Sequence, residues 1–392
     1  METIYLLEGA RTAFGSFGGS LKDIDATTLG VHASKEAIKR SGITAEEVDV
    51  TFFGHVLHSS NNAPYLARHV ALHSGVPVER PALSVNRLCG SGMQAIISAA
   101  QSLMLGEGRV ALTGGTENMS LAPHVLRGSR FGTKLGTPKV DDMLWAGLTD
   151  EYIGAGMGMT AENLAEKYDI TREEQDAFAL RSHQLATRAQ IEGKFKEEIV
   201  PLEILTRRGK QVVAEDEHIR PETSLEKLSS LRPAFKEKGT VTGGNASGIN
   251  DGAAANIIAT ESFVKEKELT PIARIVSWGI AGVDPNYMGI GPVPAMRQAL
   301  EKAQLNLEDM ALIEVNEAFA AQYLAVEKIL GFDREKANVN GGAIALGHPL
   351  GASGARVVYT LVKELQRRKE KYGIASLCIG GGQGIALIVE AL

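Results

Sequence analysis

Cys89 stands in a turn where chemistry is possible. The surrounding segment, SVNRLCGSGMQAI, ends an apolar β-like run, turns at Gly90 and Gly92, and continues with a helical pattern from about Ser91. A sulfur at a helix N-terminus experiences the partial positive charge of the helix and lies near unpaired backbone N–H groups. The pattern therefore predicts a nucleophilic thiolate, and the same N–H groups could hold a developing oxyanion. The alternative is a small buried hydrophobic cysteine.

His348 lies in a second glycine-rich turn, NGGAIALGHPLGASGARVV. Pro349, Gly351 and Gly354 kink this segment and leave room for close approach before a helix resumes. An imidazole in such a turn could act as a base at neutral pH. It could equally be a loop histidine that serves only as a hydrogen-bonding group, and the turn alone leaves both readings open.

Cys378 and Asn316 are two further polar residues next to β-like runs. Cys378 belongs to IASLCIGGGQGIALIVE, a β-run, a glycine-rich reversal and a second β-run, so packing within a strand is expected. Asn316, in LIEVNEAFAAQY, ends a β-run where the pattern predicts that a helix begins, which favours a helix N-cap. Its other possible role is to hold a water molecule or a carbonyl oxygen. The sequence contains no GxxxxGK[ST], no strand-borne GxGxxG and no Cys/His metal cluster, so nucleotide and metal sites lack motif support.

These turns belong to two similar sets of elements. In the first set, AEEVDVTFF is followed by ALSVNRLCGSGMQAIISAAQSL and RVALTGGTE. In the second, LEDMALIEVN is followed by ANVNGGAIALGHPLGASGARVVYTLVKEL and IASLCIGGGQGIALIVE, about 260 residues further on. Alternating β-like and helical stretches predict an α/β protein with mostly parallel strands. If a pseudo-twofold axis relates the halves, the Cys89 and His348 turns open onto one crevice at the carboxyl ends of strands.

The segment between the two sets is richer in Met, charged residues and Pro, and it includes the amphipathic helix REEQDAFALRSHQLATRAQIEG. We predict that residues 1–118 and 249–270 form the first half, that 119–248 form an inserted loop domain, and that 271–392 form the second half. A chain of 392 residues exceeds the roughly 250 to 300 residues at which one core stops growing, so more than one packed unit is expected.

Composition excludes several classes of function. A formal net charge of -6 and a pI near 5.9 indicate no excess of basic residues that could bind phosphate groups, so nucleic acid is not expected as a partner. No segment approaches the 18 or so uninterrupted apolar residues of a membrane span. The N-terminal METIYLLEGARTAFG lacks the features of a secretory signal, and a disulfide between the two cysteines is not expected in a reducing compartment. We therefore expect a cytoplasmic protein without a membrane partner.

Four motifs together resemble those of the thiolase family and occur in the family's order. They are RLCGSGMQA around Cys89, NEAFAAQ from Asn316, NGGAIALGHPLGASGAR around His348 and CIGGGQG from Cys378. GTVTGGNASGINDGAAA and MGIGPVPA extend the resemblance over nearly the whole chain. The resemblance implies the thiolase fold, five layers α/β/α/β/α built from two similar halves, with the inserted loop domain binding coenzyme A.

The resemblance also implies a ping-pong acyl transfer between coenzyme A thioesters, with no permanently bound cofactor and no metal. In this scheme Cys89, activated by His348, attacks an acyl-CoA to give an acyl-enzyme. Cys378 then removes a proton from the methyl carbon of a second acetyl-CoA, and the carbanion attacks the acyl group. One oxyanion site is expected from His348 and a water held by Asn316. The other is expected from the backbone N–H groups of Cys89 and Gly380.

The family pattern maps a coenzyme A site onto eight positions of this sequence. They are Ser247, Arg220, Phe235, Leu148, Met157, Met288, Ala318 and Phe319. Short-chain members of the family often have His directly before the Met of the MG(x)TAEN motif, whereas this sequence has Gly156 in GAGMGMTAEN. That difference leaves the pantetheine contacts and the chain-length preference open.

The resemblance favours a short-chain acetyl-CoA C-acetyltransferase, which joins two acetyl-CoA into acetoacetyl-CoA and coenzyme A or runs the reverse cleavage. The alternative is a 3-ketoacyl-CoA thiolase of broader chain length in fatty-acid β-oxidation. A decarboxylating ketoacyl synthase would complete its site with two His, or His and Asn, and Cys378 argues against it. The complete set of active-site residue types argues against a non-catalytic lipid-transfer protein. The segment 121–144 resembles the tetramer-forming loop of short-chain members, which predicts a homotetramer built as a dimer of dimers.

Overall fold

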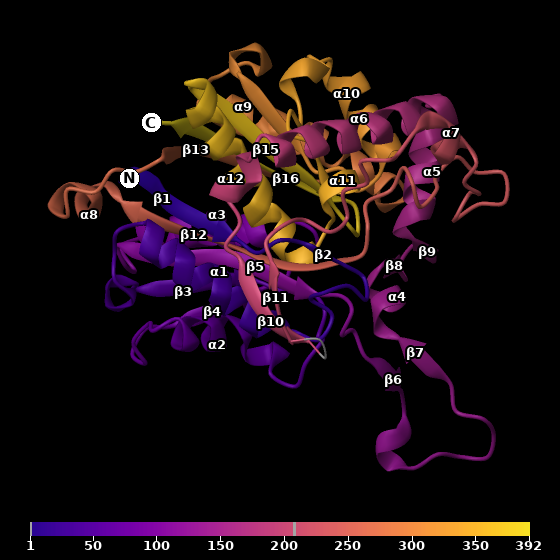
Figure 1. Ribbon diagram of the computed structural model, residues 1–392, viewed down its shortest axis with the longest axis horizontal. Coiled ribbons are helices and arrows are strands. Elements are labelled where there is room, and N and C mark those ends of the chain that lie inside the picture. The colour runs from indigo at the N-terminus through magenta and orange to yellow at the C-terminus, as the bar shows by residue number, and fades with distance from the viewer. Residues whose placement is uncertain (1, 207–208) are drawn as a thin grey trace.

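The computed structural model describes residues 2–206 and 209–392, and its centre is a ten-stranded mixed sheet (Figure 1). The strands of this sheet are β1 (Ile4–Arg11), β2 (Gly15–Ser16), β3 (Val50–Gly54), β4 (Ala82–Val85), β5 (Val110–Asn118), β12 (Asn250–Thr260), β13 (Ala273–Gly282), β14 (Leu312–Val315), β15 (Tyr372–Ile379) and β16 (Gln383–Ala391). Their order is β14-β15-β16-β13-β1-β12-β5-β3-β4, and β2 pairs with β12. Only two residue pairs, Tyr5 with Arg274 and Leu6 with Ala273, join β1 to β13. The sheet therefore consists of two halves that meet at a narrow seam.

Helices cover both outer faces and fill the space between the two half-sheets. The helices are α1 (Ala26–Arg40), α2 (Leu66–His73), α3 (Ser91–Met104), α8 (Glu261–Glu266), α9 (Pro292–Ala303), α10 (Ala320–Leu330), α11 (Ala343–Leu346) and α12 (Leu350–Arg368). Helices α1 and α2 pack on the first half-sheet, and α9 packs on the second, with α10 beside it. Helices α3 and α12 contact each other and strands of both halves. The five layers α/β/α/β/α that the family resemblance implies are confirmed.

The internal repeat is confirmed by the strand order, but the predicted strand directions are wrong. The order β1-β12-β5-β3 in the first half matches β13-β16-β15-β14 in the second. Strand β12 runs antiparallel to β1 and β5, β16 runs antiparallel to β13 and β15, and β1 runs antiparallel to β13. Among the strand pairs of this sheet in the described residues, only β3–β4, β3–β5 and β14–β15 are parallel. Strand β16 follows β15 through a tight turn in which Gly381 and Gly382 have φ of 78° and 79°. Such a turn joins only antiparallel neighbours, so the sheet is mixed.

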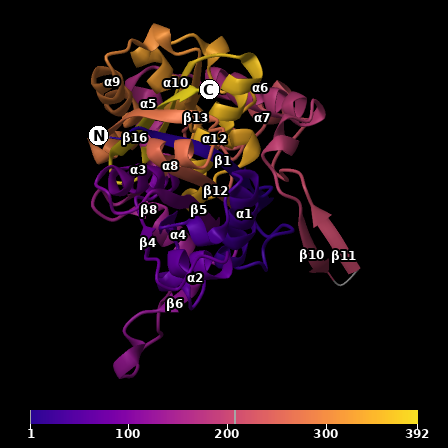
Figure 2. The ribbon, with the colours of Figure 1, turned by 90° about the vertical axis from the view of Figure 1, so that its left-hand side faces the viewer.

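The inserted segment forms smaller elements around one end of the molecule. They are β6 (His124–Leu126), β7 (Val140–Asp142), α4 (Met143–Gly147), β8 (Thr149–Asp150), β9 (Ala155–Gly156), α5 (Met157–Lys167), α6 (Arg172–Ile191), β10 (Leu202–Thr206), β11 (Gly209–Val213) and α7 (Leu225–Ser229). The predicted amphipathic helix is α6, which begins at a capping box formed by Thr171 and Glu174. Figure 2 shows the β10–β11 hairpin and the β6 segment projecting from the body. The limits of the loop domain stay a prediction. Within the described residues, no helix is long and apolar enough to cross a membrane.

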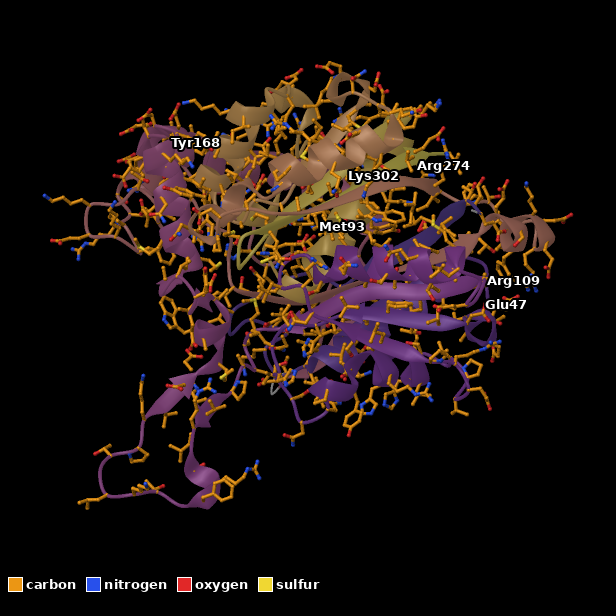
Figure 3. The ribbon with its side chains drawn as sticks, turned by 180° about the vertical axis from the view of Figure 1, so that it is seen from behind. Glu47, Met93, Arg109, Tyr168, Arg274 and Lys302 are labelled. Carbon is orange, nitrogen blue, oxygen red and sulfur yellow. The ribbon has the colours of Figure 1, made fainter. Side chains whose placement is uncertain are left out.

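Glycines let the first turns of α3 and α12 approach each other closely. A methyl group at Gly92 would lie 2.6 Å from the backbone nitrogen of Ala355, and one at Gly354 would lie 2.3 Å from the backbone nitrogen of Met93. Real Cβ atoms essentially never come within 3.0 Å of another heavy atom in this way. Figure 3 labels Met93 in this central layer. The backbones of α3 and α12 are therefore in direct contact. As a result, the turns that precede these two helices lie at the same end of the central layer.

A substitution at Gly115 of β5 should test this close packing. Its added methyl group would lie 1.8 Å from the carbonyl oxygen of Gly351 in α12, so Gly115→Ala should lower the free energy of unfolding by roughly 3 kcal/mol, the upper end of ordinary overpacking costs. Urea unfolding followed by tryptophan fluorescence measures the change. Gly282→Ala is the control, because a methyl there meets only the Gly382 oxygen at 3.9 Å. Equal stability of the two variants would contradict the proposed packing constraint.

Candidate active site

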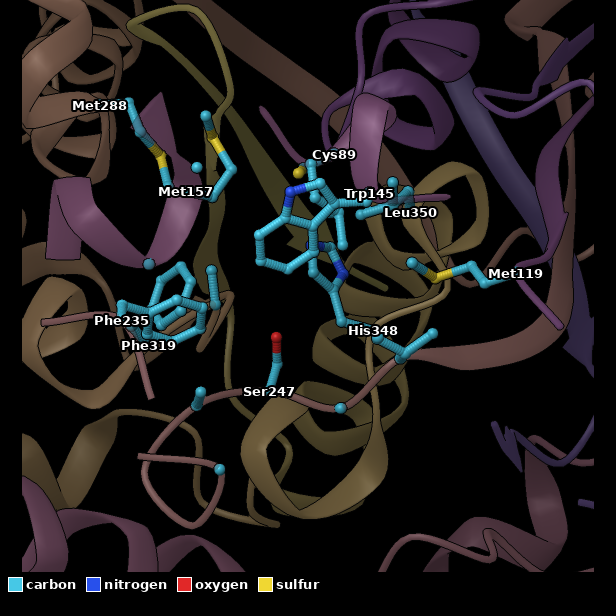
Figure 4. Close-up of a pocket in the computed structure, with 18 residues that line it drawn as sticks. Cys89, Met119, Trp145, Met157, Phe235, Ser247, Met288, Phe319, His348 and Leu350 are labelled. Carbon is cyan, nitrogen blue, oxygen red and sulfur yellow. The ribbon is translucent and has the colours of Figure 1, made fainter. Parts of the chain in front are cut away.

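An apolar pocket lies where the two half-sheets and the inserted segment meet (Figure 4). Its empty volume, open mouth included, is about 880 Å³. The lining residues are Cys89, Met119, Trp145, Leu148, Gly156, Met157, Gly158, Phe235, Gly243, Ala246, Ser247, Gly248, Ile249, Met288, Ala318, Phe319, His348 and Leu350. Cys89 and His348, which are far apart in the sequence, thus face one cavity, as the repeat predicted.

Cys89 is held in a tight turn at the start of α3. The helix begins at Ser91, as predicted, with Gly90 at its N-cap position. Leu88, directly before the cysteine, has φ of 45°, a left-handed conformation that leucine rarely adopts. Its N–H donates to Asn86 Oδ1 at 3.0 Å, and its carbonyl accepts from Ser91 Oγ at 2.6 Å. These bonds on both sides of the turn hold the strained conformation that presents the sulfur to the pocket.

His348 occupies the matching turn before α12, which begins at Leu350. Its backbone N–H donates to Asn250 Oδ1 at 3.0 Å. Its Nδ1 lies 2.6 Å from Ser353 Oγ, whose hydroxyl donates to the Pro349 carbonyl at 2.9 Å. Since a hydroxyl has a single hydrogen, the network assigns the Nδ1–H tautomer and leaves Nε2 as an acceptor. The histidine therefore offers an unprotonated nitrogen.

Asn316 lies against that nitrogen, with its Nδ2 3.4 Å from His348 Nε2. The predicted N-cap role is wrong, because α10 begins only at Ala320, with Phe319 at the N-cap position. The Asn316 N–H still bonds to the carbonyl of Ser376 in the neighbouring strand, so the chain leaves the sheet later than the pattern indicates. Its buried Oδ1 has no hydrogen-bond partner among the described residues. An oxygen in that position could hold a water molecule.

Burial sets the resting protonation of the thiol and the imidazole. It raises the pKa of Cys89 to about 11, although the N–H of Gly380 and the cysteine's own N–H act in the opposite direction. Burial also lowers the pKa of His348 to about 3, and the positive charge of Arg356 adds to this effect. The predicted resting thiolate is therefore wrong, because desolvation outweighs the N–H groups at the helix start. A neutral thiol faces the pocket together with a neutral imidazole.

Cys378 is fully buried near the end of β15, which confirms the expected strand packing. It belongs to an apolar cluster that includes Met288, Ala318 and Phe319. Burial raises the pKa of its thiol well above the ordinary value, and the charge of an ionised Cys89 raises it further. The two sulfurs are thus near enough to affect each other's ionisation. Within the described residues, no group of three or more His, Cys, Asp or Glu could hold a metal ion.

Seven of the eight positions mapped for coenzyme A line the pocket. They are Ser247, Phe235, Leu148, Met157, Met288, Ala318 and Phe319. Arg220 is exposed and outside the lining, and its N–H donates to His183 Nδ1 at 3.2 Å. Sequence reasoning missed Leu350, although it lies within the NGGAIALGHPLGASGAR motif, and it missed Met119 and Trp145, which lie outside the quoted motifs.

Glu117 is a further residue that sequence reasoning missed. Its buried carboxylate accepts N–H groups from Val56, Leu57 and Gly351 at 3.0 to 3.1 Å and lies 3.1 Å from His55 Nδ1. It therefore fastens the end of β5 to the first turn of α12. The sequence offered one signal for this role, namely an acidic residue at the end of the apolar run RVALTGGTE.

Comparison with known families accounts for almost the entire chain. The model of the thiolase N-terminal domain matches residues 4–262, and that of the thiolase C-terminal domain matches residues 269–391. This chain belongs to the thiolase family. Thiolases are acyltransferases that take coenzyme A thioesters as substrates and need no permanent cofactor.

Relatives with two different names match the chain over its full length. Human mitochondrial 3-ketoacyl-CoA thiolase is 54% identical over 389 residues, covering 99% of this chain and 98% of the relative. The acetyl-CoA acetyltransferase of Syntrophomonas wolfei is 50% identical over 394 residues, covering 99% of each. The crystal structure of the human mitochondrial 3-ketoacyl-CoA thiolase in complex with CoA has a TM-score of 0.97 at 53% identity, covering 100% of this chain and 98% of that one.

Alkylation should reveal the resting protonation of Cys89. Because the thiolate is the reactive form and the pKa of Cys89 is raised to about 11, iodoacetamide should react slowly at pH 7 and about tenfold faster per pH unit up to pH 10. Peptide mass spectrometry should find Cys89 labelled before the fully buried Cys378. A Cys89 labelling rate that is already constant between pH 7 and pH 9 would show a resting thiolate and contradict the assignment.

Proposed function

We propose that this chain is an acetyl-CoA C-acetyltransferase that joins two acyl-CoA thioesters, or cleaves a 3-ketoacyl-CoA, through an acyl-Cys89 intermediate. Condensation of two acetyl-CoA to acetoacetyl-CoA and coenzyme A is the simplest case. The observation that carries the proposal is that Cys89 and His348 line one apolar pocket with Cys378 buried close by. A nucleophile, a base and a second thiol are the groups that this reaction needs.

In the first half-reaction, Cys89 Sγ attacks the thioester carbonyl while His348 Nε2 takes the thiol proton. The assigned tautomer supports this role, since Nε2 is the unprotonated ring nitrogen and Ser353 fixes the ring through Nδ1. The N–H groups of Cys89 and Gly380 are the proposed donors to the tetrahedral oxyanion, and both already act on the sulfur. The departing coenzyme A thiolate takes the proton back from the imidazolium, which leaves acyl-Cys89 and a neutral histidine.

In the second half-reaction, Cys378 exchanges a proton with the methyl carbon of acetyl-CoA. In the proposed condensation, the Cys378 thiol first gives its proton to neutral His348, and the resulting thiolate removes the methyl proton. The enolate carbon then attacks the acyl-Cys89 carbonyl and expels the Cys89 thiolate, which takes the proton back from His348. Protonated His348 and a water at Asn316 Oδ1 are the proposed donors to the enolate oxygen. During cleavage the Cys378 thiol returns the proton to the departing carbanion. A buried thiol with a raised pKa is a strong base once ionised, which suits the weak acidity of that carbon.

The apolar walls of the pocket support this chemistry by keeping water away from the acyl-enzyme and the enolate. Pantetheine is proposed to lie along Leu148, Met157, Phe235 and Ser247, which come from the inserted segment. The relative solved in complex with CoA supports a coenzyme A site here. A role for the exposed Arg220 at the nucleotide end stays a prediction.

A 3-ketoacyl-CoA thiolase of broader chain length is the second candidate. The 54% identical human relative carries that name, and Gly156 stands where short-chain members often have His. Both candidates use the same four side chains and differ only in the length of the acyl group on Cys89.

The homotetramer and the cytoplasmic location stay predictions. Segment 121–144, which contains the β6–β7 pair, extends away from the body in Figures 1 and 2. Phe131 is 94% exposed in this segment, and Leu135 is fully exposed. Such apolar side chains on a projecting arm support a contact with another copy of the chain.

Mixing the protein with acetoacetyl-CoA and free coenzyme A should produce acetyl-CoA, and no turnover at any chain length would contradict the proposal. Cys378→Ala should slow this cleavage by about 10³-fold, the usual scale for a general acid or base. Exchange of labelled coenzyme A into acetyl-CoA, which needs only the first half-reaction, should persist in Cys378→Ala. Cys89→Ala, the matched control, should lose both activities. Full cleavage activity in Cys378→Ala would exclude the proposed role of that thiol.

A further inference from the structure

Arg356 carries a charge in the interior of the molecule, close behind the active site. It is the last residue of the NGGAIALGHPLGASGAR motif, belongs to α12 and is only 1% exposed. Its ion pair is with the buried Glu314 of β14, whose Oε2 lies 3.7 Å from Arg356 Nη1. Within the part of the chain that the structure describes, none of its three guanidinium nitrogens has a hydrogen-bond partner. A hydrocarbon side chain would fill this space at less cost, so the charge itself is what this residue supplies.

The ion pair lies one step deeper than His348 on both elements that hold the imidazole. On α12, Ser353 Oγ lies 2.6 Å from His348 Nδ1, and Arg356 follows three residues later on the same face of the helix. On the strand side, Asn316 Nδ2 lies 3.4 Å from His348 Nε2. Glu314 precedes Asn316 by two residues and therefore points to the same face of the strand. The imidazole and the ion pair are thus two successive layers between the same helix and the same strand.

The other charged groups near the ion pair have partners of their own. Those whose charge affects the pair are Arg11, Glu198, Glu317 and Glu364. Arg11 is compensated, because it donates to Glu198 at 2.8 Å and to Asp216 at 2.8 and 2.9 Å. Glu317 accepts three hydrogen bonds at 2.6 to 3.2 Å, and Glu364 is paired with two arginines near the end of its own helix. Compensation of Arg356 therefore falls to Glu314.

Glu314 can gain and lose its charge, whereas Arg356 cannot. Burial raises the pKa of Glu314 to about 8, although the positive charge of Arg356 acts in the opposite direction. The guanidinium stays protonated throughout this range. Below about pH 8 the charge of Arg356 is therefore uncompensated, and this charge adds to the effect of burial in lowering the pKa of His348. Above that pH the carboxylate of Glu314 cancels most of it.

We propose that Arg356 and Glu314 are positioning residues that act through His348, because their net charge sets how readily the imidazole takes a proton. The proposal rests on the proposed function, in which His348 becomes an imidazolium in both half-reactions. An uncompensated Arg356 opposes this second positive charge, and an ionised Glu314 removes the opposition. A unit charge about one helical turn away changes a protonation equilibrium by well over tenfold at an effective dielectric constant of about 20. Since a general base transmits part of that change to the rate, acylation of Cys89 should be about tenfold faster when Glu314 is ionised.

The pH dependence of Cys89 acetylation by acetyl-CoA tests the proposal. Rapid quenching and peptide mass spectrometry between about pH 6 and pH 9.5 should show a rate that rises about tenfold around pH 8 and is level on either side. The rise is toward high pH because ionisation of Glu314 compensates Arg356. A flat rate, or a rate that rises tenfold per pH unit without levelling, as ionisation of Cys89 would give, would overturn the proposal. Absence of acetylation at every pH would instead overturn the proposed function.

Two variants, each checked for its fold by circular dichroism, assign the rise to the ion pair. Glu314→Gln keeps the shape but cannot ionise, so the low rate should persist at every pH. Arg356→Met removes the opposing charge, so the high rate should hold from pH 6 upward, a gain that structural damage would not produce. Glu364→Gln is the matched control, since this buried glutamate lies on the same helix eight residues beyond Arg356 and should leave the rise in place. A rise that persists in Glu314→Gln, or a low rate in folded Arg356→Met, would overturn the proposal.

Discussion

The contact between the first turns of α3 and α12 is the constraint on which the rest of the site depends. Gly92 and Gly354 remove the side chains that would separate the helices, and each helix follows a turn that carries a reactive group. Since the two halves repeat the same strand order, Cys89 and His348 occupy matching positions at the same end of the central layer. Glu117 strengthens this arrangement by binding backbone N–H groups that belong to both halves.

The same burial that assembles the pocket determines how it can react. Desolvation keeps Cys89 and Cys378 as thiols and His348 as a neutral imidazole, so the resting site holds no ionised reactive group. In the proposed mechanism, charge appears only as bonds form, when the N–H groups of Cys89 and Gly380 have an oxyanion to stabilise. The apolar walls suit the proposed chemistry, because they exclude water from the reacting groups.

Motifs with a local physical cause were predictable from the sequence. The glycine turns before Ser91 and Leu350 and the repeat were placed correctly, and seven of the positions mapped for coenzyme A line the pocket, because turn chemistry and family motifs depend on neighbouring residues. Features that depend on contacts between distant parts of the chain were not predictable from the sequence. Bonding of Asn316 to the adjacent strand delays the start of α10, and the buried surroundings of Cys89 reverse its expected ionisation. Trp145 reaches the pocket only because α4 packs on a cluster from another part of the chain.

The most direct test of the account is the rate at which acetyl-CoA acetylates Cys89, followed by rapid quenching and peptide mass spectrometry. The central claim is that helix packing places His348 where it can take the proton of Cys89. A single acetyl group is expected on Cys89, and the rate should be at least about 100-fold lower in His348→Ala, the minimum expected for loss of a general base. Acetylation of Cys89 at full rate without His348, or acetylation of Cys378 instead, would contradict the account.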